Sequence, residues 1–518
     1  MFWRGKQRTS SRRNVRSPGR LNARLLRVEP LESRHLLSGV VNISIAPALP
    51  AGDMQLQGDG ANNSIQIQSG TAVSDAAIVV RGLNGTLLQI NGAPAASPVT
   101  IPGIFGSIQV QLLGGADSFE FVGAGVATPS TVQGNLRITN DSGGDSNVIH
   151  DTAINGNLIV DKVAGAGGSC NLELAGVTVV GNTTVENQTV GGSGDSTTFI
   201  TNSHLQGGGG IAFSITNGYG FDFLSVQSSD FGTGAFPGPI VTVANGDGAS
   251  EVTFTAGTTA LRTKIFGGLT MTNGTNLPGT LDQVHFINTD VLGAVAITDA
   301  GGNTRTDVQN SKLGTWLTLP APVTISNNAG SDKFTMTGSE MQWGLEIIND
   351  LAAGGASTWG SETTIDTSKI GTSPLGPVLP PPALPGDGLY ISGDSAADLI
   401  TITGTTIGGN TRLVLYNGNN RVDINTVTTA GLTVNAGTGN DDLRITQCTI
   451  SVALNVVLGP GNNRMKVKGI STLPNPALGG ILLMNGGPGL QDKFFGDLGV
   501  IPPLGLWPTF EILEDWTY

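Results

Sequence analysis

The chain reads GDSAADLITITG over residues 393–404, and the same pattern recurs as NGNNRVDINT (417–426), GTGNDDLRIT (437–446) and GPGNNRMKVKG (459–469). Each copy is a glycine-rich turn followed by a short β-forming run. The first apolar residues of the four runs that would face inward, at 400, 422, 443 and 465, are 22, 21 and 22 residues apart. A repeat of this length cannot bury its apolar side alone, so consecutive units have to stack. The period therefore predicts a solenoid.

Looser copies of the turn extend towards the N-terminus at steps of about 24 to 28 residues or twice that. These turns end at Ser118, Ser146, Cys170, Ser196, Asp222, Ser250, Thr304 and Asp332. We expect an all-β fold, a right-handed parallel β-helix of roughly 14 coils. The alternative is an antiparallel sandwich, in which distant turns need not be equivalent.

Register distinguishes the two architectures. If Val422, Leu443 and Met465 stack as inward residues, two outward rows result. The first row consists of Arg421, Asp442 and Arg464, and the second of Asp423, Arg444 and Lys466. The first row alternates in sign throughout, which favours stacking because opposite charges on neighbouring strands attract.

Composition agrees with many short strands joined by tight turns. Gly accounts for 77 of the 518 residues, charged residues for 13% and aromatic residues for 5%. Gly adopts the positive φ angles of tight turns without steric cost. Three asparagines, Asn202, Asn288 and Asn310, follow a first strand, and we expect them to turn a corner in the left-handed conformation and to stack their amides between coils.

The first 38 residues differ from the rest of the chain. They contain ten Lys and Arg and two acidic residues, which leaves 16 Lys and Arg against 37 Asp and Glu, a net charge of −21, for the remainder. No apolar run of 7–15 residues follows the basic stretch, as a secretory signal would require. An acidic body disfavours nucleic acid as a partner, and no stretch is apolar enough for a transmembrane helix.

The segment VEPLESRHLLSG (28–39) carries a resemblance. Residues 31–38, LESRHLLS, resemble the LEPR-xLL motif found near the N-terminus of many planctomycete proteins, with Ser33 in place of the usual Pro. Those proteins are typically large, repetitive and β-rich. The resemblance implies an exported or surface-associated protein, extracellular or at the cell surface, and implies no activity.

These observations divide the chain into four parts. Residues 1–39 form a basic targeting leader, disordered or helical. Residues 40–112 form an N-terminal β-cap or irregular first coils, with a hairpin expected at Asn84-Gly85. Residues 113–498 form the parallel β-helix, from which the Pro-rich loop 373–386 bulges, and residues 499–518, which contain Trp507, Phe510, Trp516 and Tyr518, form a C-terminal cap.

Few residues form a pattern typical of chemistry. The four histidines, at 35, 150, 204 and 285, have no metal-ligand spacing, and His285 is expected to face outward. Cys170 and Cys448 are expected to be buried thiols. A single loose Ca²⁺ at Asp441 or Asp442 is the one cofactor considered, against a simple role of Asp in turns. We therefore assign no catalytic, cofactor-binding or metal-binding residue.

The expected function is that of a non-enzymatic, exported or cell-surface solenoid with a structural or adhesive role. Its partner would be a polysaccharide or a surface matrix protein. The alternative is a pectate-lyase-like carbohydrate-active enzyme, a polysaccharide lyase or hydrolase, which rests on fold analogy. Its carboxylates would come from Asp195, Asp222 and Asp247, provided that they occupy equivalent positions in adjacent coils.

Overall fold

The computed structural model describes residues 39–46, 52–69, 77–102, 105–123, 130–162, 168–187, 194–208, 210–234, 238–257, 261–275, 280–315, 320–328, 330–349, 360–373, 386–470, 482–487, 492–496 and 511–512. The chain divides into two units, Met1–Leu36 and Leu37–Tyr518. Only the second contains described residues. The leader, most of the Pro-rich loop and most of the C-terminal cap lie outside the described residues, so those expectations remain predictions.

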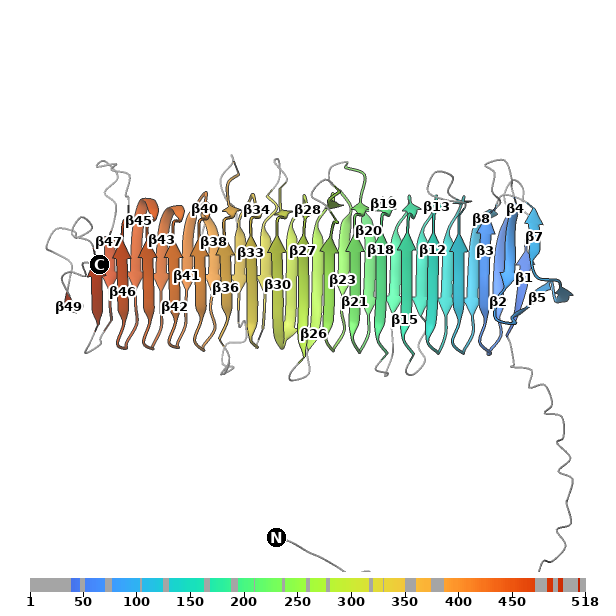
Figure 1. The fold of residues 1–518 in the computed structure, drawn as a ribbon, viewed down its shortest axis with the longest axis horizontal. Coiled ribbons are helices and arrows are strands. Elements are labelled where there is room, and N and C mark those ends of the chain that lie inside the picture. The colour runs from blue at the N-terminus through green and yellow to red at the C-terminus, as the bar shows by residue number, and fades with distance from the viewer. Residues whose placement is uncertain are drawn as a thin grey trace, which may run out of the picture. The chain divides into compact units, whose positions relative to one another are not determined.

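The second unit is a β-solenoid of parallel stacked strands, and its described residues include no helix (Figure 1). One turn contains three strands, as in β12 (Asp145–His150), β13 (Thr152–Ile154) and β14 (Leu158–Lys162). Each strand pairs in parallel with its equivalent in the next turn. The predicted parallel β-helix is therefore confirmed.

The first strands of successive turns form one sheet, here called sheet B. Its parallel strands are β3 (Ser64–Ser69), β9 (Ser118–Val122), β12, β15 (Cys170–Ala175), β18 (Ser196–Thr201), β21 (Asp222–Gln227), β24 (Ser250–Thr255), β27 (Leu281–Ile287), β30 (Asn303–Gln309), β33 (Asp332–Thr337), β36 (Glu362–Asp366), β39 (Leu399–Thr403), β42 (Arg421–Asn425), β44 (Asp442–Thr446), β46 (Arg464–Lys468), β48 (Lys493–Gly496) and β49 (Glu511–Ile512).

The second and third strands belong to sheet A. The short second strands are β10 (Ser130–Val132), β13, β16 (Thr178–Val179), β19 (His204–Leu205), β22 (Asp230–Phe231), β25 (Thr263–Ile265), β28 (Thr289–Val291), β31 (Lys312–Leu313), β34 (Glu340–Met341), β37 (Lys369–Ile370) and β40 (Thr406–Ile407). The longer third strands are β8 (Phe105–Leu112), β11 (Leu136–Asn140), β14, β17 (Thr183–Asn187), β20 (Ile211–Asn217), β23 (Ile240–Ala244), β26 (Leu269–Thr275), β29 (Val295–Gly301), β32 (Val323–Ser326), β35 (Leu345–Ile348), β38 (Asp387–Ser392), β41 (Asn410–Val414), β43 (Thr428–Asn435), β45 (Thr449–Val457) and β47 (Leu482–Asn485).

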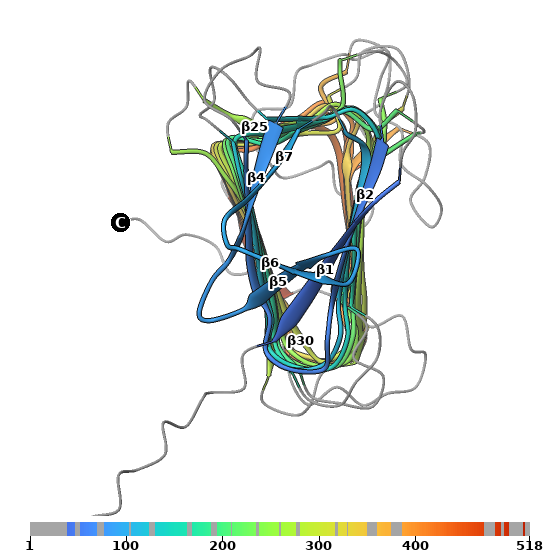
Figure 2. The same ribbon diagram turned by 90° about the vertical axis from the view of Figure 1, so that its right-hand side faces the viewer.

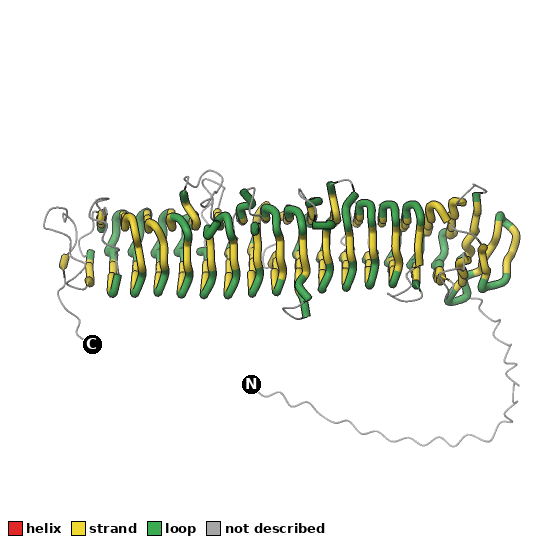
Figure 3. The backbone as a smooth tube through the Cα atoms, turned by 90° about the horizontal axis from the view of Figure 1, so that it is seen from above, coloured by secondary structure: helices red, strands yellow, loops and turns green. Residues whose placement is uncertain are grey.

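Figure 2 looks along this unit from its N-terminal end. The chain passes from sheet B over the short strands to the long strands of sheet A, and it runs clockwise as it recedes from the viewer. The winding is therefore right-handed. Figure 3 shows the same turns from above, with strands stacked on strands and loops on loops.

The core is built from apolar columns that run along the axis. Ile400, Val422, Leu443 and Met465 are direct partners in successive strands, as their spacing predicted. None of the four is more than 2% exposed. Burial of such a side chain stabilises the fold by about 1.5–3 kcal/mol, and the column repeats in every turn.

The N-terminal end contains antiparallel pairs, formed by β1 (Val40–Ile45) with β2 (Gly52–Gly58), and by β4 (Ala77–Gly82) with β3 and with β7 (Val99–Pro102). Asn84 and Gly85 have the positive φ angles expected, 51° and 86°, but the predicted hairpin there is wrong. The strands on either side join different sheets, because β4 pairs within sheet B while β5 (Leu87–Ile90) pairs with β1 in sheet A. A hairpin does link β5 to β6 (Ala93–Ala95) through Asn91-Gly92.

Stacking of the turns explains a share of the glycine. A Cβ atom at Gly143 would overlap the carbonyl oxygen of Gly115 in the preceding turn, and Gly143 also has a φ of 140°. The same relation joins Gly439 to Gly418. Glycine is thus required where the backbones of consecutive turns meet.

The corner after the first strand has the predicted conformation. Asn202, Asn288 and Asn310 have φ angles of 49°, 53° and 49°. Their amides, however, do not form the ladder that we expected. Asn288 donates instead to the carbonyl oxygen of Ala256 at 3.4 Å, because the corner side chain lies beside the backbone of the preceding turn.

An asparagine ladder exists at the opposite corner, where the third strand ends. Asn187, Asn217, Asn245 and Asn273 each belong to a different turn, and the Nδ2 of each of the first three donates to the Oδ1 of the next at 2.9 Å. All four side chains are buried. The amides of Asn217 and Asn245 both donate and accept within the ladder, which satisfies groups that burial would otherwise penalise.

A second buried row, the carboxylate ladder, begins the strands of sheet B. It consists of Asn63, Asp117, Asp145, Cys170, Ser196, Asp222, Ser250, Asp282, Thr304, Asp332, Ser361, Asp398, Asn420, Asp441, Asn463 and Asp492. An oxygen of one member accepts a hydrogen bond from the preceding turn. Examples are Asp222 from the Ser196 hydroxyl at 2.6 Å and Asp441 from the Asn420 amide at 3.0 Å.

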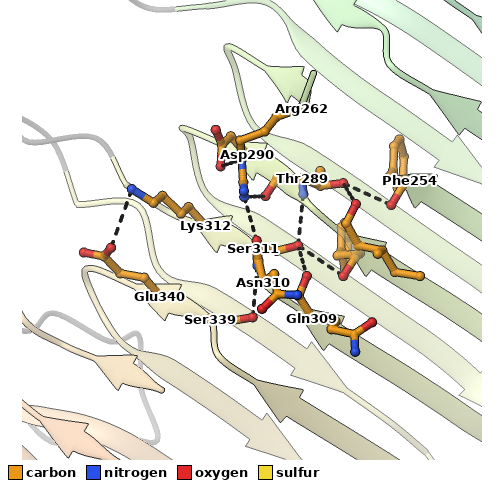
Figure 4. Close-up of polar contacts among 12 residues, drawn as sticks. Phe254, Arg262, Thr289, Asp290, Gln309, Asn310, Ser311, Lys312, Ser339 and Glu340 are labelled. Carbon is orange, nitrogen blue, oxygen red and sulfur yellow. Dashed lines mark hydrogen bonds and ion pairs between the residues drawn. The ribbon is translucent and has the colours of Figure 1, made fainter. Parts of the chain in front are cut away.

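A third row consists of hydroxyl groups directly after the left-handed corner. The backbone N–H of Thr289 donates to the Ser311 hydroxyl at 3.0 Å, and the N–H of Ser311 donates to the Ser339 hydroxyl at 3.1 Å (Figure 4). The Ser311 hydroxyl in turn donates to carbonyl oxygens, among them that of Gln309 at 2.9 Å. Three polar rows therefore fix the register of the turns.

Candidate functional site: the outer faces of the solenoid

Sheet B presents alternate residues to the outside, and both predicted charged rows are present there. In the first row, Arg421 is the direct partner of Asp442, and Asp442 is the direct partner of Arg464. In the second row, Asp423 is the direct partner of Arg444. The Arg444 guanidinium contacts the Asp442 carboxylate at 2.6 Å and that of Asp423 at 3.7 Å. These contacts raise the pKa of Arg444, chiefly through the hydrogen bond to Asp442.

The last turns of this face carry a strong excess of positive charge. Outward positions from β42 to β48 hold six of the 16 Lys and Arg residues that follow residue 38, against Asp423 and Asp442. We define the basic patch as Arg444, Arg464, Lys466, Lys468 and Lys493. The Arg464 guanidinium lies 5.1 Å from the ring centre of Phe495.

The earlier turns of the same face have the opposite character. Between β9 and β24 the charged residues at outward positions are Glu120, Glu173 and Glu251, with His150, and none of these described positions holds Lys or Arg. Sheet B is therefore acidic over its first turns and basic over its last.

An exposed aromatic group lies in the acidic region. The rings of Phe199 and Phe223 pack with centres 5.5 Å apart at an angle of 58°. Phe221 directly precedes the inward-facing Asp222, Phe223 directly follows it, and Tyr219 lies two residues before Phe221. The exposed fractions are 44% for Phe199, 41% for Phe221 and 52% for Tyr219. We call Phe199, Tyr219, Phe221 and Phe223 the aromatic group. Large exposed aromatic side chains in one place are typical of a binding surface.

A row of alternating charge, which we did not predict from the sequence, runs along the short strands. Its members are His204, Asp230, Lys264, Asp290, Lys312, Glu340 and Lys369, each the direct partner of the next. Arg262 adds a contact of 2.7 Å to Asp290, and the Lys312 ammonium lies 4.0 Å from Glu340 (Figure 4). We call these seven residues the charge row.

A local signal could have revealed this row. Each member follows a Ser or Thr and precedes an apolar residue, as in Ser203-His204-Leu205 and Ser311-Lys312-Leu313. The hydroxyl belongs to the buried row at the corner, the charged residue faces out and the apolar residue faces in. This triplet of hydroxyl, charged and apolar residues is too short to predict a row by itself. It does so only when the turns are aligned with one another.

Three histidines lie close to carboxylates of neighbouring turns. His150 is 3.1 Å from Glu173, His285 is 3.1 Å from Asp307 and His204 is 4.0 Å from Asp230. His285 faces outward as predicted, although its side chain is only 18% exposed. The described residues contain no group of three or more His, Cys, Asp or Glu arranged to hold a metal ion.

The three aspartates considered for an enzyme are not equivalent. Asp222 belongs to the buried carboxylate ladder, whereas Asp195 precedes that position and accepts a hydrogen bond from the Phe221 N–H at 3.0 Å. Asp247 accepts from the N–H of Thr275 at 2.9 Å. Each carboxylate therefore links two consecutive turns, and the three do not occupy the equivalent positions that the enzyme alternative required.

The candidate calcium residues have separate roles. Asp441 is buried and accepts from Asn420, whereas the side chain of Asp442 contacts Arg444. Cys170 and Cys448 are free and buried, as predicted. Burial raises the pKa of the Cys170 thiol to about 11, so the thiol is protonated at neutral pH.

No protein-family model, curated protein or solved structure matches this chain. Among the described residues there is no helix with the length and apolar character needed to cross a membrane.

Proposed function

We propose that the protein is a non-enzymatic, exported or cell-surface solenoid that has a structural role and adheres to polysaccharide or to a surface matrix. The aromatic group carries the adhesive part of this proposal. It places Phe199 and Phe223 on a flat outer sheet, where solvent exposure of two rings costs free energy that a ligand would recover.

The surroundings of the aromatic group favour an uncharged sugar polymer. Asn171, Thr197 and Ser225 lie at outward positions on β15, β18 and β21 and offer amide and hydroxyl groups. Sugar rings present C–H groups to aromatic faces and hydroxyls to such polar side chains. The acidic residues Glu173 and Glu251 beside them disfavour an anionic partner.

The structural part rests on the three buried polar rows and the apolar columns. These rows bond each turn to the next, so they stabilise the solenoid along its length. The carboxylates considered for a lyase or hydrolase also bond to neighbouring turns, Asp222 within the carboxylate ladder and Asp195 and Asp247 in exposed bonds. The leader motif LESRHLLS supports export.

Binding of the purified chain to insoluble neutral polysaccharides tests the adhesive role. We expect pull-down on cellulose or xylan to fall at least tenfold in a Phe199→Ala, Phe223→Ala variant. Leu399→Ala is the matched control, because Leu399 is an exposed apolar residue on the same face, 38% exposed and outside the aromatic group. Equal binding by both variants would contradict the proposal.

Two further measurements test the remaining parts. Immunolabelling of intact cells should detect the protein at the surface, and labelling that requires permeabilised cells would contradict export. Incubation with polysaccharides should release no reducing or unsaturated ends, and release that survives purification would support the enzyme alternative.

A further inference from the structure

The basic patch stands out because its cations face one another. Arg444 on β44 is the direct partner of Lys466 on β46, and Arg464 on β46 is the direct partner of Lys493 on β48. Neighbouring parallel strands are about 4.8 Å apart, so these like charges repel each other and destabilise the fold.

One other pair of cations on sheet B, Arg305 and Lys333, are direct partners, but both contact carboxylates. Arg305 contacts Asp307 at 2.7 Å and Lys333 contacts Glu362 at 3.0 Å. In the charge row, Lys312 lies between Asp290 and Glu340. Among the described residues, no carboxylate lies within ion-pair distance of Arg464, Lys466 or Lys468. Side chains that oppose local stability are more often retained for binding than for folding.

We propose that the basic patch binds a linear, carboxylated polysaccharide that lies along the solenoid axis. This inference rests on the proposed adhesive function and names a second class of partner for the same face. Cations recur on β44, β46 and β48 at the strand spacing of about 4.8 Å, which is close to the length of one sugar residue in an extended chain.

The chemistry of the patch suits carboxylate groups. The guanidinium of Arg464 lies against the Phe495 ring and is thereby held in place on the outer face. Lys466 and Lys468 are exposed ammonium groups two residues apart on one strand. A bound carboxylate would relieve the repulsion between partners such as Arg464 and Lys493, so binding and local stability would increase together.

Two other anionic partners fit less well. The first turns of sheet B could face the patch in a second copy, but their glutamates, at 120, 173 and 251, lie on the nonadjacent strands β9, β15 and β24. Duplex nucleic acid carries a far higher density of negative charge, and the net charge of −21 after residue 38 repels it.

The test compares two variants of the full chain for binding to polygalacturonate by isothermal titration calorimetry at low salt. We expect Arg464→Gln, Lys466→Gln, Lys468→Gln to weaken binding at least tenfold and to make it less dependent on salt. The matched control, Arg305→Gln, Lys333→Gln, also removes cations from outward positions of sheet B, but both of these cations already contact carboxylates. It should bind as the unaltered chain does.

Several results would overturn the proposal. They are unchanged affinity in the patch variant, an equal loss in the control, or equal binding of a DNA duplex or of anionic lipid vesicles through the same residues. Concentration-dependent dimerisation that the patch variant abolishes would assign the patch to self-association instead. The patch variant should keep its binding to neutral polysaccharide. The Phe199→Ala, Phe223→Ala variant should keep its binding to polygalacturonate. These two results distinguish failure of one proposal from failure of the other.

Discussion

The side-chain amide of Asn217 donates a hydrogen bond to the amide oxygen of Asn245 at 2.9 Å, although 28 residues separate them in the chain. Both side chains are buried at the end of a long strand of sheet A. Asn245 repeats the relation with Asn273, so the amide of Asn245 is at once acceptor and donor. The turn that contains Asn245 therefore depends on both of its neighbours for this buried amide.

Removal of one member should damage two bonds. In Asn245→Ala, the Nδ2 of Asn217 and the Oδ1 of Asn273 lose their partner inside the protein. An unsatisfied buried group costs about 1–3 kcal/mol, so we expect the free energy of unfolding to fall by about 2 kcal/mol or more. Chemical denaturation measures it. Thr242→Ala, at a half-buried position on the same strand, should change it by less than about 0.5 kcal/mol, and equal losses would contradict the role of the ladder.

The carboxylate ladder predicts greater stability in mild acid. Burial raises the pKa of Asp222 and of Asp398 to about 7, and that of Asp117 to about 6. In the unfolded chain an Asp has a pKa of about 3.9, so between these values the folded state binds more protons. Its stability is then greatest at low pH and is lost as the pH rises through about 7. We expect the Tm to rise when the pH is lowered from 8 to 5.

An amide variant isolates this effect. Asp222→Asn keeps an oxygen that accepts from Ser196 and carries no charge at any pH. The variant should be more stable than the original chain at pH 8 and should show a smaller change in Tm between pH 8 and pH 5. A Tm that falls on acidification in both proteins would refute the assignment.

Stacked backbones predict a strong effect at one glycine. Gly143→Ala forces a Cβ against the carbonyl oxygen of Gly115 and requires a left-handed φ, which costs about 1–3 kcal/mol. At Gly60 an added Cβ meets no atom within 4 Å. Gly60→Ala should therefore leave the Tm almost unchanged. Comparable Tm values for the two variants would show that the turns separate easily.

Charge reversal in the charge row should lower stability in a salt-dependent manner. Asp290→Lys would place a cation between Lys264 and Lys312 and beside Arg262. We expect a loss of about 1 kcal/mol or more at low ionic strength and a smaller loss in 1 M salt, where charges are screened. Asp290→Asn removes the attraction without adding a repulsive charge. Its free energy of unfolding should therefore lie between those of the unaltered chain and Asp290→Lys. A loss that salt does not reduce would point to packing instead.

The sequence predicted the solenoid because its period was visible in apolar residues. The spacing of Ile400, Val422, Leu443 and Met465 gave the correct stacking, and the outward rows of Arg421 and Asp423 followed from alternation. The hairpin at Asn84-Gly85 was wrong because a local turn signal does not say which sheet the next strand joins. That choice depends on β1 and β3, which are remote in sequence.

The candidate site was harder to predict than the fold. The aromatic group and the basic patch are separated by more than 200 residues, and only the assembled sheet places them on one face. The asparagine ladder was expected at Asn202, Asn288 and Asn310, where the left-handed corner was correct. Burial, which composition does not reveal, decides that Asn217 and Asn245 bond to each other instead.

The strict alternation from His204 to Lys369 has a consequence for how such a chain can change its length. Deletion of one turn, for example the one that contributes Asp290, would bring Lys264 against Lys312. Deletion of two adjacent turns would restore an acid opposite a base. Within this stretch, we therefore expect insertions and deletions of turns to preserve stability only in even numbers, because an odd number places like charges opposite each other.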